Sequence, residues 1–231
     1  MEVISLLPEL RQPNRLHLLL GIIQRHGAPD WCIENLLLVA TSPPIRRSLE
    51  RVLSNGRALE QLTLLCSRSS RFADVLAREP LLFESMVGRP EDLLSPGIGW
   101  EFLRQSDLVR FRVYNSFKAI VRFVAGEATV GEFTAELSQL AERIIRDSFG
   151  QAVEEVPDAP TLPLALVALG KLGGGEISIR SDLDVVLFYR EGAGGSHAGT
   201  AVAVARRLRE KLEGAYEVDF RLRPEGRISP V

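Results

Sequence analysis

The stretch from Leu164 to Tyr189, LALVALGKLGGGEISIRSDLDVVLFY, constrains the fold of this chain more than any other. Its two apolar runs, Leu164–Leu169 and Val185–Tyr189, predict two β-strands, and the first has the composition of a strand buried on both faces. Between them lies Gly170–Gly175, where glycines permit unusual backbone conformations and let a phosphate approach bare N–H groups. The stretch therefore predicts a strand, a glycine turn and a second strand.

Two aspartates open the second predicted strand. Because side chains alternate across a strand, Asp182 and Asp184 face the same way while Leu183 faces the other. Neighbouring carboxylates repel unless a cation neutralises them, and hard oxygen ligands suit Mg²⁺, with Mn²⁺ as an alternative. Solvated aspartates at a strand start would show the same spacing, but the preceding strand and glycine turn favour a metal site.

A third strand is predicted over Tyr216–Leu222, after an amphipathic helix over Thr200–Leu212 whose apolar stripe includes Val202. If the second and third strands run parallel, strand, helix and strand form a right-handed crossover. Alternation leaves three polar side chains on one face of the third strand: Asp219, Arg221 and Arg223. We expect Asp219 to lie close to the first two aspartates. Surface Asp and Arg side chains along an exposed edge strand would show the same alternating pattern.

Residues 1–160 predict helices throughout, because apolar residues recur at spacings of three and four. Asn55-Gly56 is predicted to stop one helix, and a long helix is predicted from Leu103 to about Gly126. The proline-rich segment Val156–Pro163 is expected to separate a helical region, 1–160, from a catalytic core, 161–231. The predicted fold class is α+β: a mostly helical N-terminal region, then a small mixed sheet with flanking helices.

Composition excludes several classes of protein. The 231 residues carry a net charge of −2 without long charged runs, so we expect no nucleic-acid partner. The N-terminus lacks the basic start of a signal peptide, and no apolar run reaches the roughly 18 residues of a membrane span. Cys32 and Cys66 are too few for a disulfide scaffold and are expected to be buried. We therefore expect a cytoplasmic protein that is not bound to a membrane.

The motif also resembles a known family. Glycine–lysine, further glycines and S-D-x-D opening a hydrophobic strand resemble the nucleotidyltransferase superfamily that includes DNA polymerase β. More closely, GKLGG-x-E, SDLD and the later VDFRLRPEGR resemble the bacterial glutamine synthetase adenylyltransferase/adenylyl-removing enzymes. Two earlier segments, Ser42–Leu53 and Cys66–Val87, resemble the helical lead-in of that family. The likeness covers most of the chain beyond about residue 40.

Together these residues predict a three-carboxylate, two-metal site for nucleotidyl transfer, with ATP, or phosphate and ADP, as substrate or product. Asp182 and Asp184 would hold both ions, while Asp219 would bind the second ion and accept the proton of the attacking hydroxyl. The predicted phosphate- and nucleotide-binding residues are Gly170, Lys171, Gly173, Gly174, Ser181, Arg221 and Arg223. Glu176 matches an acidic position of the family, and neither it nor His197 receives a role.

The resemblance implies a function in nitrogen assimilation. Family members add AMP from ATP to a tyrosine of glutamine synthetase, or remove it by phosphorolysis with release of ADP. The PII signal protein is a further candidate partner. Both directions use the same carboxylates; the position of Asp182 along the chain favours the adenylyl-removing unit, although an excised transferase unit also fits.

Two alternatives remain open: a nucleotidyltransferase with another acceptor, and a catalytically inactive nucleotide-binding or regulatory module. The family leads us to expect an R-R-x-E-like stretch in the long helix, where this chain has Arg112–Asn115 and lacks the acidic residue. The family also continues into further helices beyond residues 226–231, so we expect a fragment or an abbreviated relative.

Overall fold

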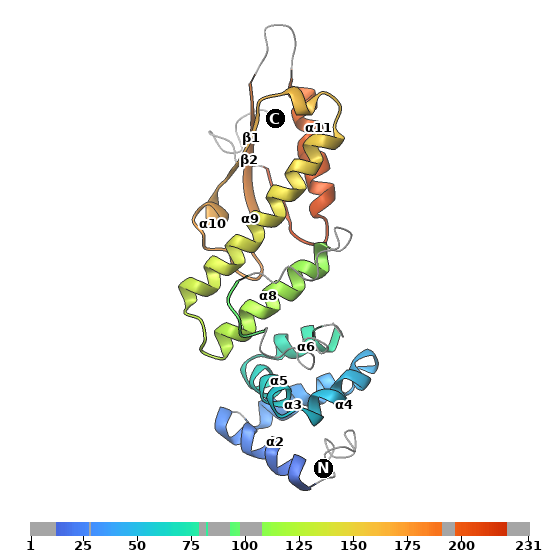
Figure 1. Cartoon of the computed structure of the whole chain (residues 1–231), viewed down its shortest axis with the longest axis vertical. Coiled ribbons are helices and arrows are strands. Elements are labelled where there is room, and N and C mark those ends of the chain that lie inside the picture. Colours follow the sequence, from blue (N-terminus) through green and yellow to red (C-terminus); the bar gives the residue numbers. More distant parts are fainter. Residues whose placement is uncertain are drawn as a thin grey trace. The chain divides into compact units, whose positions relative to one another are not determined.

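The structure is a computed structural model that describes residues 13–27, 29–78, 82, 93–97, 108–190 and 197–220. Helices dominate this part of the chain and three short strands form a mixed sheet, which confirms the predicted α+β class (Figure 1). Two compact units are present, Met1–Pro96 with Phe117–Thr129 and Gly97–Ser116 with Val130–Val231. Among the described helices, none is long and apolar enough to cross a membrane.

The first unit is helical, as predicted. Its elements are α2 (Pro13–His26), α3 (Pro29–Ala40), the 3-10 turn η2 (Pro43–Ile45), α4 (Arg46–Ser54), α5 (Gly56–Arg68) and α6 (Ser70–Arg78). Helices α2, α3 and α6 each pack against α5, and α3 also packs against α6. Cys32 and Cys66 are fully buried in this core, as expected, and both thiols are free. Burial raises the pKa of Cys32 to about 11 and that of Cys66 well above its usual value, so neither thiol is primed for reaction.

The Asn55-Gly56 pair acts as both a stop and a start. Helix α4 ends at Ser54, which confirms the predicted stop. The Asn55 side chain then accepts a hydrogen bond of 3.1 Å from the Ala58 N–H, so Asn55 caps α5 and Gly56 is its first residue. The cap satisfies a donor that the helix itself leaves open, and it joins two helices with a single residue between them.

The second unit contains the sheet. Its elements are α9 (Val130–Glu155), η3 (Ala159–Thr161), β1 (Leu164–Ala168), α10 (Gly170–Gly173), β2 (Leu183–Tyr189), α11 (Ala198–Leu212) and β3 (Val218–Asp219). Helix α8 (Leu108–Val124) contributes its first half to this unit and its second half to the other. The long helix predicted from Leu103 is thus present over Leu108–Val124, and its predicted start lies outside the described residues.

The strands follow the order β1-β2-β3. Strand β1 runs antiparallel to β2, from Leu164 opposite Tyr189 to Ala168 opposite Val185, and β2 runs parallel to β3. The predicted strand–helix–strand unit is therefore β2, α11 and β3. The prediction that the first strand is buried on both faces is wrong: β1 pairs with one neighbour among the described strands, and its Val167 is 40% exposed.

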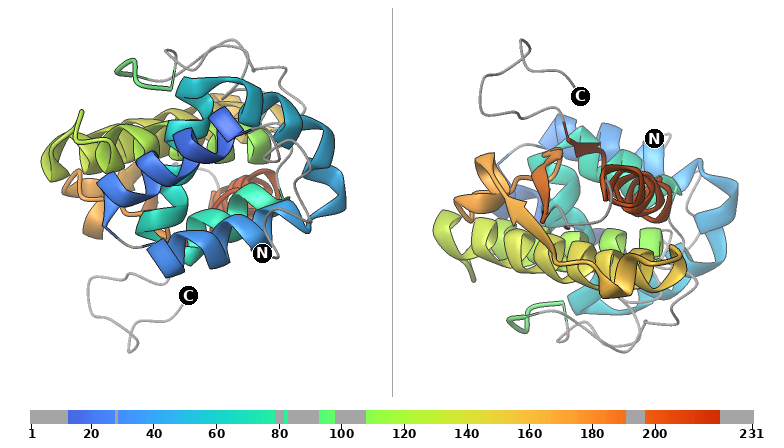
Figure 2. Two further views of the ribbon diagram at one scale, coloured as in Figure 1. Left: turned by 90° about the horizontal axis from the view of Figure 1, so that it is seen from below. Right: turned by 90° about the horizontal axis from the view of Figure 1, so that it is seen from above.

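At the start of β2 one face is fully buried and the other is half-buried. Leu183 and Val185 are fully buried, and α11 packs against both β2 and α9 (Figure 2). The buried stripe of α11 consists of Ala201, Val204, Leu208 and Leu212. Val202 was predicted to lie in that stripe but is 63% exposed. The buried stripe begins one residue earlier, at Ala201.

The proline-rich segment 156–163 lies inside the second unit. Ala159 is fully buried, and η3 contacts both α9 and α11. The boundaries of the compact units thus differ from the predicted boundary between residues 160 and 161. Helix α9 belongs to the second unit because it packs against α11, which connects β2 to β3. That residues 161–231 form a domain of their own stays a prediction.

Candidate metal centre

Three aspartates converge at the start of β2. Asp184 and Asp219 lie opposite each other in the parallel β2–β3 pair, and Asp182 precedes Asp184 by two residues, on the same face. One carboxylate oxygen from each of the three lies within 4.8 Å of the other two. Asp182 is exposed, while Asp184 and Asp219 are half-buried. The predicted convergence is therefore confirmed, and the roles assigned to these residues stay predictions.

The pKa of the Asp184 carboxyl group is raised above its ordinary value. Burial is the largest cause, and the negative charges of Asp182 and Asp219 add to it. The Lys171 ammonium group opposes the shift. The charged form of Asp184 is thus disfavoured by its surroundings, and a bound cation would reverse that preference.

The three carboxylates fit a hard divalent cation. Mg²⁺ binds oxygen at about 2.0–2.1 Å in octahedral geometry, which separates its ligand oxygens by roughly 3–4 Å. Oxygens within 4.8 Å of one another reach that arrangement through small side-chain rotations. All three donors are carboxylate oxygens, which Mg²⁺ and Mn²⁺ prefer over softer ligands.

The loop that carries Asp182 is held by two serines. The Ile177 N–H donates to Ser138 Oγ of α9 at 3.1 Å, and Ile177 itself is buried. The Ser178 N–H donates to Ser181 Oγ at 2.9 Å, and the two hydroxyl oxygens are also 2.9 Å apart. The Ser181 hydroxyl therefore already orders this loop, and its predicted contact with phosphate stays untested.

Arg112 links the approaches to both aspartate-bearing strands. Its Nη2 donates to the Ile179 carbonyl at 3.0 Å, and its guanidinium carbon lies 4.3 Å from the centroid of the Tyr216 ring. Ile179 precedes Asp182, and Tyr216 precedes Asp219. Sequence reasoning noted only that the stretch Arg112–Asn115 lacks the acidic residue of the family motif. It missed this role of Arg112, because the hydrogen-bonding partner lies 67 positions along the chain.

The glycine turn is more ordered than predicted. Gly170–Gly173 form the single helical turn α10, and the N–H groups of Gly173 and Gly174 donate to the Leu169 and Gly170 carbonyls at 2.9 and 3.0 Å. These two N–H groups are therefore engaged, and binding of phosphate by them would require these bonds to break. Lys171, in the same turn, is exposed.

Other predicted positions lie elsewhere. Arg221 and Arg223 lie outside the described residues, as does most of the glycine-rich loop before His197. A ring nitrogen of His197 lies 2.9 Å from the Arg190 carbonyl oxygen. Arg122 of α8 is buried, and it donates to the Leu94 and Glu127 carbonyls, so it has a structural role.

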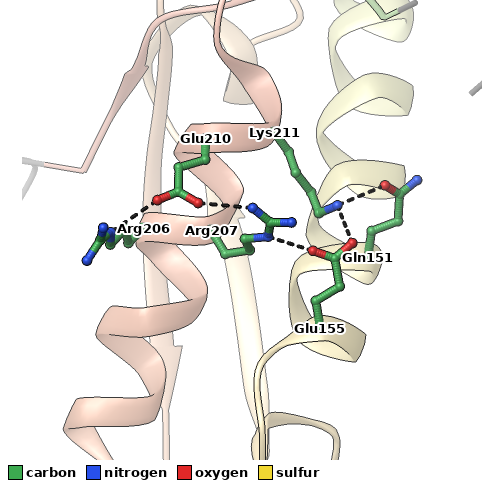
Figure 3. A network of polar contacts seen from close by, with 6 residues as sticks. All are labelled: Gln151, Glu155, Arg206, Arg207, Glu210 and Lys211. Carbon is green, nitrogen blue, oxygen red and sulfur yellow. Dashed lines mark hydrogen bonds and ion pairs between the residues drawn. The ribbon is translucent and has the colours of Figure 1, made fainter. Parts of the chain in front are cut away.

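A second charged cluster joins α9 to α11 (Figure 3). Glu155 of α9 accepts hydrogen bonds from Lys211 Nζ at 2.6 Å and from Arg207 Nε at 2.5 Å. Arg207 also donates to Glu210 at 3.1 Å, and Arg206 donates to the same carboxylate at 3.1 Å. We call these five residues, with Gln151 as a further acceptor for Lys211 at 3.2 Å, the α9–α11 network. Hydrogen bonds from Lys211 and then Arg207 lower the pKa of Glu155.

The site thus defines an α+β protein whose small mixed sheet presents a triad of aspartates from two parallel strands. Comparison with known proteins identifies its family. Residues 101–231 match the family described as glutamate-ammonia ligase adenylyltransferase, and the chain belongs to that family.

Individual relatives agree. The chain is 33% identical over 204 residues to a bifunctional glutamine synthetase adenylyltransferase/adenylyl-removing enzyme of Streptomyces avermitilis, a match that covers 80% of this chain and 20% of that protein. A protein of the same name from Neisseria meningitidis serogroup B is 31% identical over 196 residues, covering 74% of this chain and 21% of the relative. The chain spans about a fifth of the length of these relatives.

Proposed function

We propose that this chain is a metal-dependent nucleotidyltransferase that moves AMP to or from a tyrosine of glutamine synthetase. One observation carries the proposal: three aspartates meet on adjacent parallel strands in a chain of the glutamate-ammonia ligase adenylyltransferase family. The names of the relatives supply the acceptor protein and both directions of transfer. This function places the protein in the cytoplasm, with the PII signal protein as a candidate partner.

The aspartates have distinct tasks in this proposal. Mg²⁺ or Mn²⁺, when bound, would neutralise phosphate charge and polarise the α-phosphate. Asp182 and Asp184, at the start of β2, would hold the ion. Asp219, on the neighbouring strand, would be a further ligand, and it accepts the proton of the attacking hydroxyl. Lys171 acts as a point charge toward the phosphates, which its electrostatic effect on Asp184 supports.

The two directions use the same reaction centre. In transfer, the tyrosine oxygen bonds to the α-phosphorus of ATP, the bond to the β-phosphate breaks, and pyrophosphate leaves. In removal, a phosphate oxygen bonds to that phosphorus, the bond to the tyrosine oxygen breaks, and ADP leaves while the tyrosine takes up a proton. Because both reactions exchange groups at one phosphorus, one set of carboxylates serves either.

The test is to incubate the chain with Mg²⁺ and either ATP plus unmodified glutamine synthetase or phosphate plus the adenylylated form. The synthetase is then weighed by mass spectrometry. A gain or loss of one AMP supports the proposal and identifies the direction. An unchanged mass in both mixtures contradicts the proposal. It favours one of the two alternatives, a nucleotidyltransferase with another acceptor or a regulatory module.

A further inference from the structure

Gly170 lies against the Asp184 carboxylate. It is separated from β1 by one residue, Leu169, opens α10, and has a φ of +53°. An ideal Cβ built on Gly170 would lie 2.1 Å from Asp184 Oδ2 and 3.0 Å from Asp184 Cγ. The first separation is far below van der Waals contact, so a side chain at residue 170 and the present position of this carboxylate exclude each other.

The backbone of Asp184 has little room to yield. The Leu169 N–H donates to the Asp184 carbonyl at 2.8 Å, which extends the β1–β2 pairing to the residue beside Gly170. On its other side Asp184 pairs with Asp219, and the neighbouring Leu183 and Val185 are fully buried. Since the strand is held from both sides, a Cβ at residue 170 would turn the carboxylate instead of moving the strand.

We propose that Gly170 is a positioning residue: its missing Cβ leaves the space in which the Asp184 carboxylate is aimed at the metal centre. This inference rests on the proposed function, and it replaces the predicted contact of Gly170 with phosphate by a contact with a metal ligand. Turning a ligand carboxylate away weakens metal binding in the way that loss of other supporting contacts does, by about 10–100-fold.

The turn supplies a matched control. Gly175 also has a positive φ, of +70°, but a Cβ there would meet no atom within 4 Å. Alanine at either position strains the backbone, because residues with a Cβ disfavour this conformation. Only at Gly170 does the added Cβ also meet a carboxylate, so the difference between the two variants isolates that contact.

The test compares the Mn²⁺ affinity of the whole chain with that of Gly170→Ala and Gly175→Ala, by calorimetric titration, with circular dichroism to verify folding. We expect Gly170→Ala to weaken Mn²⁺ binding about 10–100-fold and Gly175→Ala to change it by less than about threefold. Equal affinities in all three proteins, or equal losses in both variants, would overturn the inference.

A double-variant cycle separates this inference from the proposed function. Asp184→Ala removes the overlapping atoms, so it should reduce the loss of melting temperature caused by Gly170→Ala and leave that of Gly175→Ala unchanged. If Gly170→Ala alone does not fold, recovery of folding in the double variant with Asp184→Ala supports the contact between residue 170 and the carboxylate. A double variant that also fails to fold overturns the contact. If the wild-type chain binds no Mn²⁺, the proposed function fails, while the cycle still decides the contact.

Discussion

Two groups of charged side chains in the second unit behave in opposite ways. In the α9–α11 network, carboxylates alternate with cations, and hydrogen bonds from Lys211 and Arg207 lower the pKa of Glu155. At the proposed metal centre, carboxylates face one another, and burial with the charges of Asp182 and Asp219 raises the pKa of Asp184. In the network, cations offset the carboxylates, whereas the aspartates of the triad repel one another, which in the proposed function a divalent cation would offset.

The two pKa shifts have opposite consequences for stability. A carboxyl group with a lowered pKa in the folded state stabilises the fold above its ordinary pKa, and that contribution is lost as pH falls through the lowered value. A carboxyl group with a raised pKa in the folded state destabilises the fold as the pH rises from the ordinary pKa of the group through its raised pKa. The network therefore contributes to stability at neutral pH, while the charged Asp184 opposes it.

The largest expected effect comes from removing the charge of Asp184. Asp184→Asn should reduce the rate of AMP transfer or removal by at least about 10³-fold, because a metal-binding carboxylate is lost at the place where negative charge develops on the phosphate. The same variant should melt at an equal or higher temperature than the wild type in metal-free buffer near neutral pH, since it removes a charge that the fold disfavours.

Steady-state assays and thermal unfolding in a chelating buffer measure both sides of this prediction. Activity close to that of the wild type would refute the role of Asp184. A much lower melting temperature would show that the triad stabilises the fold and would remove the contrast with the network.

A smaller effect is expected from Lys211→Met, which keeps the length of the side chain but deletes its charge. Lys211 is the most shielded cation of the network, with its side chain 15% exposed. Its loss should lower the free energy of unfolding by about 1 kcal/mol and leave catalysis unchanged. Chemical denaturation measures the cost, and Arg206→Met is the control, because Arg206 is 82% exposed and should contribute almost nothing. Equal costs in the two variants would contradict the ranking.

The smallest effect is expected from Glu155→Gln. Its melting temperature near neutral pH should lie about 1–3 °C below that of the wild type, because exposed ion pairs stabilise weakly. The difference should shrink as pH falls through the lowered pKa of Glu155, where the wild-type carboxylate also becomes neutral. Melting curves over a pH series test this, and a difference independent of pH would assign the effect to packing.

Much of the geometry of the aspartate triad was predictable from local patterns. Alternation along a strand placed Asp182 with Asp184 and set Asp219 apart from its apolar neighbours, and the helix after β2 indicated the crossover that brings Asp219 beside Asp184. These rules depend on neighbours in sequence, so they need no knowledge of the remaining fold.

The features that sequence reasoning missed depend on distant contacts. A run such as that of β1 reads as a buried strand, yet its exposure is decided by which strands lie beside it. Arg112 meets Ile179 and Tyr216 only after the chain has folded. No local periodicity encodes these contacts. The glycine turn differs, because its hydrogen bonds are local: it was predicted to offer N–H groups, but one helical turn engages those of Gly173 and Gly174.

The contrast between the two charged groups can be tested with Mn²⁺ as a paramagnetic probe in nuclear magnetic resonance. At substoichiometric Mn²⁺, the amide signals of Leu183, Asp184 and Asp219 should lose intensity, those of Glu155 and Glu210 should keep theirs, and excess Mg²⁺ should restore the lost signals. Loss centred on the α9–α11 network, or no selective loss at all, would contradict a metal centre at the aspartate triad.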